Sequence, residues 1–541
     1  MKKYSIIFCL FTVIIAIFTA ICIFMTEKTD LLGIRRLEPA VEFHENDGKM
    51  IISWNKLPYP CLYTVETYCP TTGLLDKNQE ARLIDRQLLL ANSCEVVRTS
   101  IPMQYKISAY GIFGKLDSPF VPVAHPFYQE PLMPVTITHY TPENPASVMP
   151  YLVWHSVPKA VCYEIELLSA PPENEHGTEL SKKHRLVSTS KVYTNGWQAD
   201  LHDYADEPAL YWRVRALDRH RRPIGVFSQA EPLFIDKKAP VPDYPLINSF
   251  DKMPGEQLLL YPAYNWIPMH NASRYDVELL AVAPKKEHET APADDYLWHK
   301  ISNDTFSCYD EKPRLKAGHY FWRVRAVDAN GSTIGKFSST AEFTVHSRLK
   351  RTFAASFGDS ITHGGGAISY SPASREYDYI SYLDFDAVNL GKSGDTAETS
   401  LKRFDNDVLP FKPYNLLIMT GANDLRAGHS VKEITGNLEK IKQKCLDNDI
   451  RPIFLTLLPL NPDNIYMAFG SFTNQNWRSD LAEVNKYIRS QEYFIDLEPH
   501  FYDSSRKVLD GGLAIDGLHP DIRGKMLIAE IINANRQILR K

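Results

Sequence analysis

The sequence predicts a multidomain protein with an N-terminal transmembrane helix, three β-sandwich domains and a C-terminal three-layer α/β/α domain built on a parallel sheet. Three observations give this prediction. An uncharged apolar segment opens the chain, a pattern of about one hundred residues then recurs, and after Val345 short apolar runs alternate with helical stretches. A chain of 541 residues is also too long for one core. Its 44% hydrophobic and 23% charged residues are typical of folded domains.

The first thirty residues predict a signal anchor, residues 1–30. Two lysines precede Tyr4–Met25, a run of 22 residues without a charged side chain. A helix of that length is about 33 Å long and crosses the hydrocarbon core of a bilayer. The lysines place the amino terminus in the cytoplasm, so we expect a single-pass membrane protein with the rest of the chain on the extracytoplasmic side. The alternative is secretion after signal cleavage, although a cut after Ala20 would place bulky Phe18 where a small residue is usual.

A long segment of the chain repeats itself. The sequence WRVRALDRHRRPIGVFS, beginning at Trp212, returns as WRVRAVDANGSTIGKFS at Trp322, and a weaker copy, YKISAYGIFGKLDS, begins at Tyr105. Upstream of each copy a tryptophan precedes a tyrosine by nine residues, and the units recur every 100 to 112 residues. These pairs are Trp54 with Tyr63, Trp154 with Tyr163, and Trp266 with Tyr275. The repeat predicts three domains of similar fold, at residues 36–125, 130–236 and 240–346.

Side chains within the repeats alternate with a period of two. In the segments that start at Tyr163 and Tyr275, apolar residues take one face and carboxylates the other, and in both WRVRA segments the arginines take the outer face. Such alternation is typical of strands with one packed and one solvated face, and a hundred residues of them predict a two-sheet sandwich. The early tryptophan and the YWRVRA-type strand resemble fibronectin type III domains. We expect Trp54, Trp154 and Trp266 to fill the cores, with glycan or protein binding by exposed aromatics as the alternative.

After Val345 the pattern becomes that of an α/β domain, residues 350–541. Short continuous apolar runs separated by helical stretches predict a parallel sheet covered on both faces. The expected strands are Thr352–Phe357, Asp386–Leu390, Asn415–Thr420, Pro452–Leu457 and Tyr493–Asp496, and the expected helices are Ser430–Asp447, Asn476–Ser490 and Ile522–Leu539.

Four loops of this domain carry residues suited to chemistry. Ligands of open α/β sheets bind beyond the carboxyl ends of the strands, so the polar residues that follow each predicted strand are the candidates. They are Ser360 after the first strand, Gly394 after the second, Asn423 after the third, and Asp516 with His519 before the last helix.

These residue types supply what acyl transfer needs. A serine hydroxyl becomes a good nucleophile when an imidazole accepts its proton, and a carboxylate on the other ring nitrogen fixes the tautomer and stabilises the imidazolium. Asp516 and His519 are three residues apart around a glycine and can meet within one turn. The oxyanion of the tetrahedral intermediate needs preorganised donors, which the N–H groups of Ser360 and Gly394 and the side-chain amide of Asn423 offer.

The segments GDSIT, NLGKSGDT, GAND and DGLHP, in that order, resemble the four blocks of the SGNH (GDSL-type) hydrolase family. The resemblance covers the whole C-terminal domain. It implies that Ser360 is the nucleophile, His519 the base and Asp516 the acid that orients it, with Ser360, Gly394 and Asn423 as the oxyanion hole. It also implies a three-layer fold and a reaction that requires neither metal nor cofactor.

Other polar residues of these loops have plainer expected roles. Asp359 and Asp424 are expected to hydrogen-bond to loop backbone. Asp395 and Thr396 are expected to begin a helix. His363 is expected to be a solvated loop residue, with a place in the lining of the acyl pocket as the alternative.

The charge and the cysteine content of the chain argue against nucleic acid and zinc as ligands. A net charge of −5 and a pI near 6.4 give no electrostatic reason to expect nucleic acid. The eight cysteines show no CxxC pair and no Cys/His spacing typical of zinc sites, and they form no evident disulfide framework. Cys61, Cys69 and Cys94 fall in one predicted domain and could include one bridge.

The sequence thus predicts an extracytoplasmic serine ester hydrolase. Fibronectin-type modules beside an SGNH domain resemble enzymes that remove acetyl or other short acyl groups from polysaccharide or cell-wall glycan, so the expected substrate is an acylated carbohydrate or another ester. Two alternatives stay open. One is a lipolytic esterase or thioesterase for longer acyl chains, and the other is a surface adhesion or scaffold protein with an incidental hydrolase domain.

Overall fold

The structure of the protein, a computed structural model, describes most of the chain between Leu37 and Arg540. The residues outside the described part are 1–36, 45–48, 58, 70–81, 97–102, 112–113, 119–120, 124–132, 158–159, 175–176, 208–209, 219, 249–258, 346–350, 366–374, 506 and 541.

The predicted location as a single-pass membrane protein is corrected. Within the described residues, no helix combines the length and the apolar composition that crossing a bilayer requires. The longest of these helices, α5 (Val431–Asp447), has 17 residues, many of them charged, whereas a crossing needs about 20 consecutive apolar residues. The predicted anchor, Tyr4–Met25, lies outside the described residues.

The described residues between Pro39 and Val345 form three β-rich units of antiparallel sheets with a common topology. In each unit one sheet has the same path, β4-β3-β6-β7, β11-β10-β13-β14 and β19-β18-β21-β22, with β8, β15 or β23 added to its third strand. The second sheets are β1-β2-β5, β12-β9 and β16-β17-β20. The strands are β1 (Pro39–His44), β2 (Lys49–Trp54), β3 (Cys61–Cys69), β4 (Arg82–Leu89), β5 (Ser93–Val96), β6 (Met103–Gly111), β7 (Gly114–Asp117) and β8 (Val121–Val123) in the first unit; β9 (Tyr151–Val153), β10 (Cys162–Leu168), β11 (Arg185–Val192), β12 (Gly196–Gln198), β13 (Leu210–Leu217), β14 (Pro223–Ile224) and β15 (Glu231–Leu233) in the second; and β16 (Leu246–Ile247), β17 (Ala263–Ile267), β18 (Arg274–Leu280), β19 (Trp298–Ser302), β20 (Ser307–Tyr309), β21 (Gly318–Val327), β22 (Thr333–Ile334) and β23 (Ala341–Val345) in the third.

The tryptophan and tyrosine that recur nine residues apart pack against each other in every unit. Their ring centroids are 5.4 Å apart in the first unit, 5.2 Å in the second and 4.9 Å in the third. Trp54, Trp154 and Trp266 are all buried. The prediction that these tryptophans fill the cores is therefore confirmed.

The face of these sheets that was predicted to be solvated is covered instead. In the second unit Arg213 and Glu166 are fully buried and form an ion pair with an N–O distance of 2.5 Å. Arg323 and Glu278 form the equivalent buried pair in the third unit, also at 2.5 Å. Arg213 also donates to the carbonyl oxygen of Asn174, in the segment that covers the sheet. Period-two alternation separates the two faces but does not show whether a loop covers the polar one.

The cysteines of the first unit form no bridge among the side chains that the structure describes. Cys61 and Cys94 carry free thiols, and burial raises the pKa of Cys94 to about 11. The side chain of Cys69 lies outside the described part.

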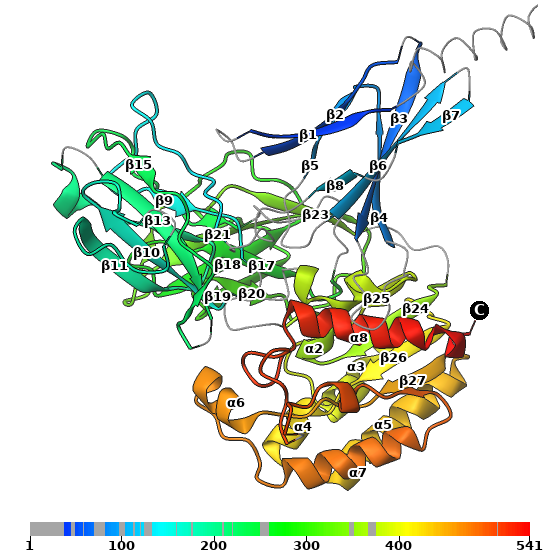
Figure 1. The fold of residues 1–541 in the computed structure, drawn as a ribbon. Helices are drawn as coiled ribbons and strands as arrows, with labels where there is room; N and C mark the ends of the chain where they lie inside the picture. The colour runs from blue at the N-terminus through cyan, green and yellow to red at the C-terminus, as the bar shows by residue number, and fades with distance from the viewer. Residues whose placement is uncertain are drawn as a thin grey trace, which may run out of the picture.

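The C-terminal part is an α/β domain whose five strands pair in parallel in the order β25-β24-β26-β27-β28. Helix α5 contacts both α3 and α7 in one layer, and α8 contacts η3 and η4 in another. Figure 1 shows the sheet between these layers. Every predicted strand and helix overlaps an observed one. The elements are β24 (Ala354–Gly358), α2 (Ser360–His363), η3 (Arg375–Tyr377), η4 (Tyr379–Tyr382), β25 (Ala387–Asn389), α3 (Ala397–Asp407), β26 (Asn415–Met419), α4 (Ala422–Ala427), α5 (Val431–Asp447), β27 (Arg451–Leu455), α6 (Pro462–Phe469), α7 (Trp477–Arg489), β28 (Phe494–Ile495), η5 (Glu498–His500), α8 (Ile522–Ala534) and η6 (Arg536–Ile538).

The second and third β-rich units lie against the α/β domain. In Figure 1 the third unit lies above the α/β domain, and its strands β19 and β20 lie on the side that faces that domain. Leu260 and Tyr261 belong to the same hydrophobic cluster as the core of the α/β domain, and the Leu260 N–H donates to the Asn389 carbonyl oxygen at 3.4 Å. Val161 of the second unit packs against Ile515. These contacts bring the β-rich units to the carboxyl ends of the parallel strands.

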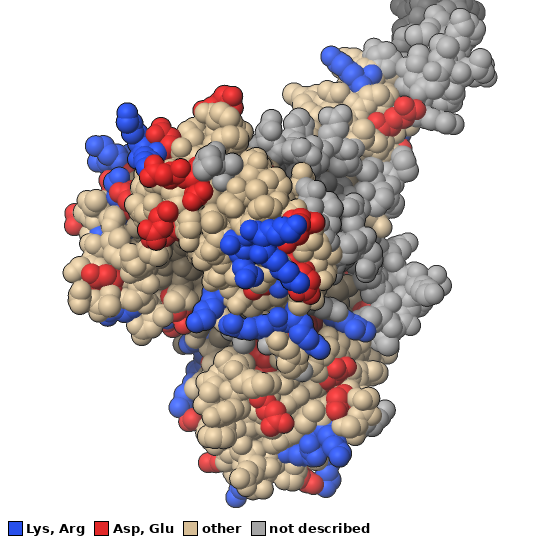
Figure 2. Space-filling model, turned by 60° about the vertical axis from the view of Figure 1, so that its left-hand side comes forward, with Lys and Arg blue, Asp and Glu red and all other residues tan. Residues whose placement is uncertain are grey.

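Charged side chains of both signs are interspersed on the face of the molecule drawn in Figure 2. Lysine and arginine side chains gather there where the β-rich units meet the α/β domain, and acidic side chains lie close beside them. This mixture agrees with the small net charge of the whole chain.

Candidate active site

Ser360 lies at the point where β24 ends and α2 begins, at the place in the sheet where the strand order reverses. Asp359 caps the helix, because its carboxylate accepts the Ile361 N–H at 3.0 Å. At Gly358 the backbones of β24 and β26 lie so close together that a Cβ would collide with the Met419 carbonyl oxygen. As the first residue of the helix, Ser360 has an N–H without an intrahelical acceptor, and the residue is partly exposed.

His519 and Asp516 complete a hydrogen-bonded relay with Ser360. The Ser360 Oγ lies 2.8 Å from His519 Nε2, although 159 residues separate the two in the chain. On the other side of the ring, His519 Nδ1 lies 2.8 Å from Asp516 Oδ2. A carboxylate only accepts at Nδ1, so the ring proton is on Nδ1 and Nε2 is free to accept the serine proton. Asp516 itself is buried.

The turn that holds Asp516 and His519 is built by the chain between them. Asp516 Oδ1 accepts the N–H groups of Leu518 at 2.9 Å and His519 at 2.7 Å. Gly517 has a φ of 80°, and a Cβ there would collide with the Asn461 carbonyl oxygen. A glycine is therefore required both for the conformation and for the space.

Gly394 lies in the loop after β25, and Asn423 lies in the first turn of α4, directly after β26. Gly394 has a φ of 86° and is exposed. The Asn423 side-chain amide donates to the Asp395 carbonyl oxygen at 2.9 Å, which joins α4 to the loop of Gly394. Because the amide nitrogen carries two hydrogens, one can hold the loop while the second serves another acceptor.

Two neighbouring residues have the structural roles predicted for them. Asp424 accepts the Ala397 N–H at 2.9 Å, and Thr396 is the N-cap of α3. Burial raises the pKa of Asp359 to about 6.

One buried arginine, which was not predicted from the sequence, connects the ends of β24 and β25. Arg403, on α3, donates to the Gly358 carbonyl oxygen at 3.0 Å and to the Leu390 carbonyl oxygen at 2.8 Å. It also forms ion pairs with Asp395 at 2.5 Å and Asp407 at 2.9 Å. The carbonyls at the ends of two strands are thus held by one guanidinium.

His363 differs from its prediction as a solvated residue, because it is fully buried. Its Nδ1 lies 2.8 Å from Ser393 Oγ, and its Nε2 lies 2.7 Å from the Tyr261 carbonyl oxygen. Burial lowers the pKa of His363 to about 4. The third β-rich unit covers this histidine, and the sequence around residue 363 contains no sign of that cover.

Four exposed apolar side chains, which we call the apolar rim, come from α6 and the chain that follows it, and one of them lies against His519. The Phe469 ring meets the His519 ring edge-on with centroids 6.0 Å apart, and the Tyr466 and Phe472 rings stack at 4.7 Å. Phe472 is 84% exposed. Exposed apolar patches often mark binding surfaces. The members of the apolar rim are Tyr466, Met467, Phe469 and Phe472.

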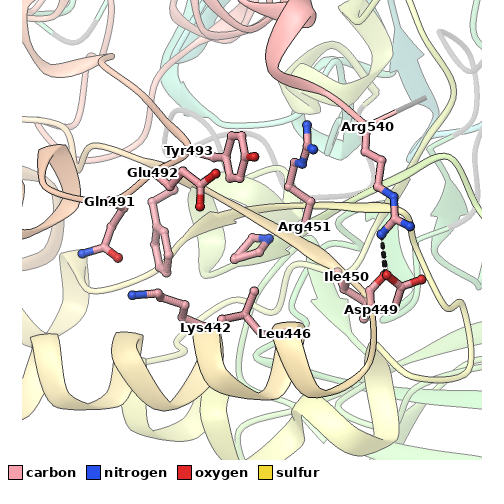
Figure 3. A pocket seen from close by; sticks show the side chains of 11 residues that line it. Lys442, Leu446, Asp449, Ile450, Arg451, Gln491, Glu492, Tyr493 and Arg540 are labelled. Atoms are coloured by element: carbon pink, nitrogen blue, oxygen red, sulfur yellow. Dashed lines mark hydrogen bonds and ion pairs between the residues drawn. The ribbon is translucent and has the colours of Figure 1, made fainter.

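A pocket of about 330 Å³ lies at the opposite, amino-terminal edge of the sheet (Figure 3). Arg451 and Tyr493, at the starts of β27 and β28, line it, and at its rim Arg540 pairs with Asp449 at 2.5 Å. None of the predicted site residues lines this pocket. Among the described residues, no group of three or more His, Cys, Asp or Glu side chains is arranged to hold a metal ion.

A serine, a histidine and an aspartate in this arrangement, beyond the carboxyl ends of a parallel sheet, define the class of serine ester hydrolases. Residues 356–527 match the GDSL-like Lipase/Acylhydrolase family, and the chain belongs to that family. A curated relative, the uncharacterized lipoprotein YqeF of Bacillus subtilis (strain 168), is 31% identical over 186 residues, which are 30% of this chain and 74% of that protein. Its name is that of a lipoprotein, which also departs from the predicted single-pass membrane protein.

Solved structures also resemble the chain. The lipase/acylhydrolase from Enterococcus faecalis is 24% identical, with coverage of 36% of this chain and 100% of that chain and a TM-score of 0.28. An acetylxylan esterase from Geobacillus stearothermophilus is 18% identical, with coverage of 35% of this chain and 96% of that chain and a TM-score of 0.27.

Proposed function

We propose that the chain is a serine esterase that removes acetyl or other short acyl groups from an extracellular polysaccharide or cell-wall glycan through an acyl-Ser360 intermediate. The observation that carries the proposal is the relay of two 2.8 Å hydrogen bonds from Ser360 through His519 to Asp516. The name of the curated lipoprotein relative supports action outside the cytoplasm.

The proposed reaction has two halves. In the first, Ser360 Oγ attacks the ester carbonyl while His519 Nε2 takes the serine proton, and the N–H groups of Ser360 and Gly394 and the amide of Asn423 stabilise the oxyanion. His519 then gives its proton to the leaving alkoxide, and the alcohol departs. In the second half, His519 takes a proton from water, the hydroxide attacks the acyl-enzyme, and the acid is released as the proton returns to Ser360. Asp516 keeps the imidazole in one tautomer throughout.

The apolar rim supports a large alcohol as the leaving group. Phe469 lies against His519, which is the residue that protonates the leaving oxygen in the proposed reaction. A sugar ring bonded to that oxygen would therefore lie over Phe469 and its neighbours. The same exposed apolar surface also suits a long acyl chain, so a lipolytic esterase or thioesterase is the second candidate.

We further propose that residues 36–125, 130–236 and 240–346 are fibronectin type III-like domains that form a spacer in front of the hydrolase domain at residues 350–541. The repeated sheet path and the buried Trp–Tyr pairs support this assignment. The alternative is an adhesion protein, in which these domains bind a glycan or a protein. In that case the Ser360→Ala variant should bind the same ligand with unchanged affinity.

The test is hydrolysis by the full chain, with Ser360→Ala as the variant and Ser479→Ala as its matched control, because Ser479 is an exposed serine on α7. We expect wild type and Ser479→Ala to release acetate from acetylated glycans and from aryl acetates, and Ser360→Ala to release none above background. Activity retained by Ser360→Ala contradicts the proposal.

A panel of aryl esters of increasing acyl length separates the two candidates. A steep fall in kcat/KM beyond about four carbons favours the short-acyl esterase, since a pocket that fits a short acyl group excludes a longer one. A rise in kcat/KM with chain length favours the lipolytic enzyme.

A further inference from the structure

The third β-rich unit reaches the loop that carries Gly394. Tyr309, at the end of β20, donates its hydroxyl hydrogen to the Ser393 carbonyl oxygen at 3.0 Å. That carbonyl and the Gly394 N–H belong to one planar trans peptide unit, in which C=O and N–H point in opposite directions. The Tyr309 hydroxyl therefore fixes the direction of the Gly394 N–H from the far side of the same peptide.

His363 binds the backbone N–H of the same residue, Ser393. The Ser393 N–H donates to His363 Nδ1 at 3.2 Å, so this nitrogen carries no proton and the ring proton is on Nε2. The Nε2–H in turn donates to the Tyr261 carbonyl oxygen, at 2.7 Å. A neutral imidazole thus links the loop before Gly394 to the backbone of the third unit, through the N–H of the same residue whose carbonyl oxygen accepts the Tyr309 hydroxyl.

Two tyrosine rings keep this imidazole in place. Tyr309 and Tyr261 both meet the His363 ring edge-on, with centroids 5.4 Å and 6.3 Å away. The Tyr261 hydroxyl also hydrogen-bonds to Asp407 on α3. His363 and Tyr261 are both buried, whereas Tyr309 and Ser393 are half-buried.

The Gly394 peptide needs such external support. A glycine at φ 86° has no side chain to pack and adopts many other conformations at little cost. Apart from Gly394 and its two chain neighbours, no described residue has an atom within 4 Å of the position that a Cβ would occupy. Oxyanion donors accelerate the reaction because their orientation is set before the charge develops.

We propose that Tyr309 is a positioning residue of the hydrolase, and that the third β-rich unit completes its active site by orienting the Gly394 amide toward the oxyanion. This inference rests on the proposed function, in which the Gly394 N–H is an oxyanion donor. In this role Tyr309 acts through the Ser393–Gly394 peptide. The polar contact that carries this role is one hydroxyl hydrogen bond, so its removal leaves the ring packing intact.

The experiment compares Tyr309→Phe with Tyr320→Phe in the full chain. Tyr320 is the matched control, because its hydroxyl also donates to a backbone carbonyl, that of Lys316 at 2.6 Å, elsewhere in the same unit. On an aryl acetate we expect Tyr309→Phe to lower kcat about tenfold and to change KM less than twofold. An alkyl boronic acid, which adds to Ser360 Oγ as a tetrahedral adduct with a negatively charged oxygen, should bind Tyr309→Phe more weakly by the same factor. We expect Tyr320→Phe to match wild type in both measurements.

Three other results would overturn the proposal. Unchanged kcat and boronate affinity in Tyr309→Phe contradict the positioning role alone. A loss of activity that disappears once rates are divided by the titrated concentration of active sites assigns Tyr309 to folding only. A wild-type protein that neither hydrolyses the ester nor binds the boronate contradicts the proposed function and this inference with it.

Discussion

The carboxylate of Asp516 holds His519 at two points. Its Oδ2 lies 2.8 Å from the imidazole Nδ1, and its Oδ1 accepts the backbone N–H of the same histidine at 2.7 Å. The acid therefore fixes both the position of the histidine backbone and the tautomer of its ring. Because Asp516 is buried and rigidly bonded, a change of one atom in its side chain should reach Ser360 through the ring.

Asp516→Asn tests this relationship. The asparagine keeps the oxygen that accepts the backbone N–H groups, but its amide presents a hydrogen to Nδ1 and so moves the ring proton to Nε2. With Nε2 protonated, the ring cannot accept the serine proton, and we expect kcat to fall by about 10³- to 10⁴-fold. Steady-state kinetics give the value, and Asp503→Asn, at an exposed turn of the same domain, should keep wild-type kcat. A loss of less than tenfold in Asp516→Asn would show that the tautomer does not matter.

Gly394→Ala tests the backbone of the oxyanion loop. A Cβ at this position meets no described atom within 4 Å beyond its own residue and the two chain neighbours, so the cost comes only from the left-handed conformation at φ 86°. We expect a loss of about 1–2 kcal/mol in stability and a fall in kcat of at least tenfold, as the loop relaxes and the amide turns. The matched control is Gly436→Ala, within α5, where the same change also meets open space but should stabilise the helix by about 0.5–1 kcal/mol. Equal effects on kcat at the two positions would contradict this account.

Arg323→Met tests the covered ion pairs of the β-rich units. The variant leaves Glu278 fully buried without its cation, and we expect the third unit to lose about 3–5 kcal/mol. Hydrogen exchange of peptides from β18 and β21 measures this loss locally. The control Lys402→Met breaks an exposed pair with Glu398 and should leave the exchange of its helix unchanged. Replacing both Arg323 and Glu278 with apolar residues should recover most of the stability, and failure to do so would show that another contact is responsible.

The burial of His363 predicts a pH dependence of stability. Its pKa falls from 6.5 to about 4 because burial disfavours the charged ring, and the nearby charges of Arg403, Lys525 and Lys392 act in the same direction. Between pH 6.5 and 4 the unfolded chain binds a proton that the folded chain does not. The folded state therefore loses stability as the pH falls through this range, by up to about 3 kcal/mol from this group.

The variant His363→Gln isolates that contribution. The raised pKa of Asp359, about 6, acts in the opposite direction over an overlapping range, but it does so equally in both proteins. We expect the difference in melting temperature between wild type and His363→Gln to shrink as the pH is lowered from 7 to 4.5. A difference that stays constant over this range would mean that His363 does not titrate as its burial requires.

The sequence was most informative where function and local structure depend on short segments. The strands of the α/β domain were evident because each is a continuous apolar run, and the turn around Gly517 brings Asp516 to His519 within four residues. The same was true of the Trp–Tyr pairs, whose spacing repeats.

Contacts between distant segments of the chain could not be predicted from the sequence. The start of helix α3 was predicted at Asp395 and Thr396, but its extent was not. Its core-facing side includes Ser400, Arg403 and Asp407, which interrupt the apolar period of an amphipathic helix. His363 looked solvated because its cover comes from Tyr261 and Tyr309, in another unit of the chain. Such contacts follow from the packing of whole domains and leave no local pattern.

Covalent labelling of the full chain with a fluorophosphonate tests the central claim most directly, since this reagent phosphonylates a serine whose proton an adjacent base removes. The labelled site is read by peptide mass spectrometry and compared with the esterase activity that remains. We expect one modified residue, Ser360, with activity lost in proportion to labelling and no labelling of a His519→Ala variant. Labelling of a different serine, or full activity in protein labelled at Ser360, would contradict this expectation.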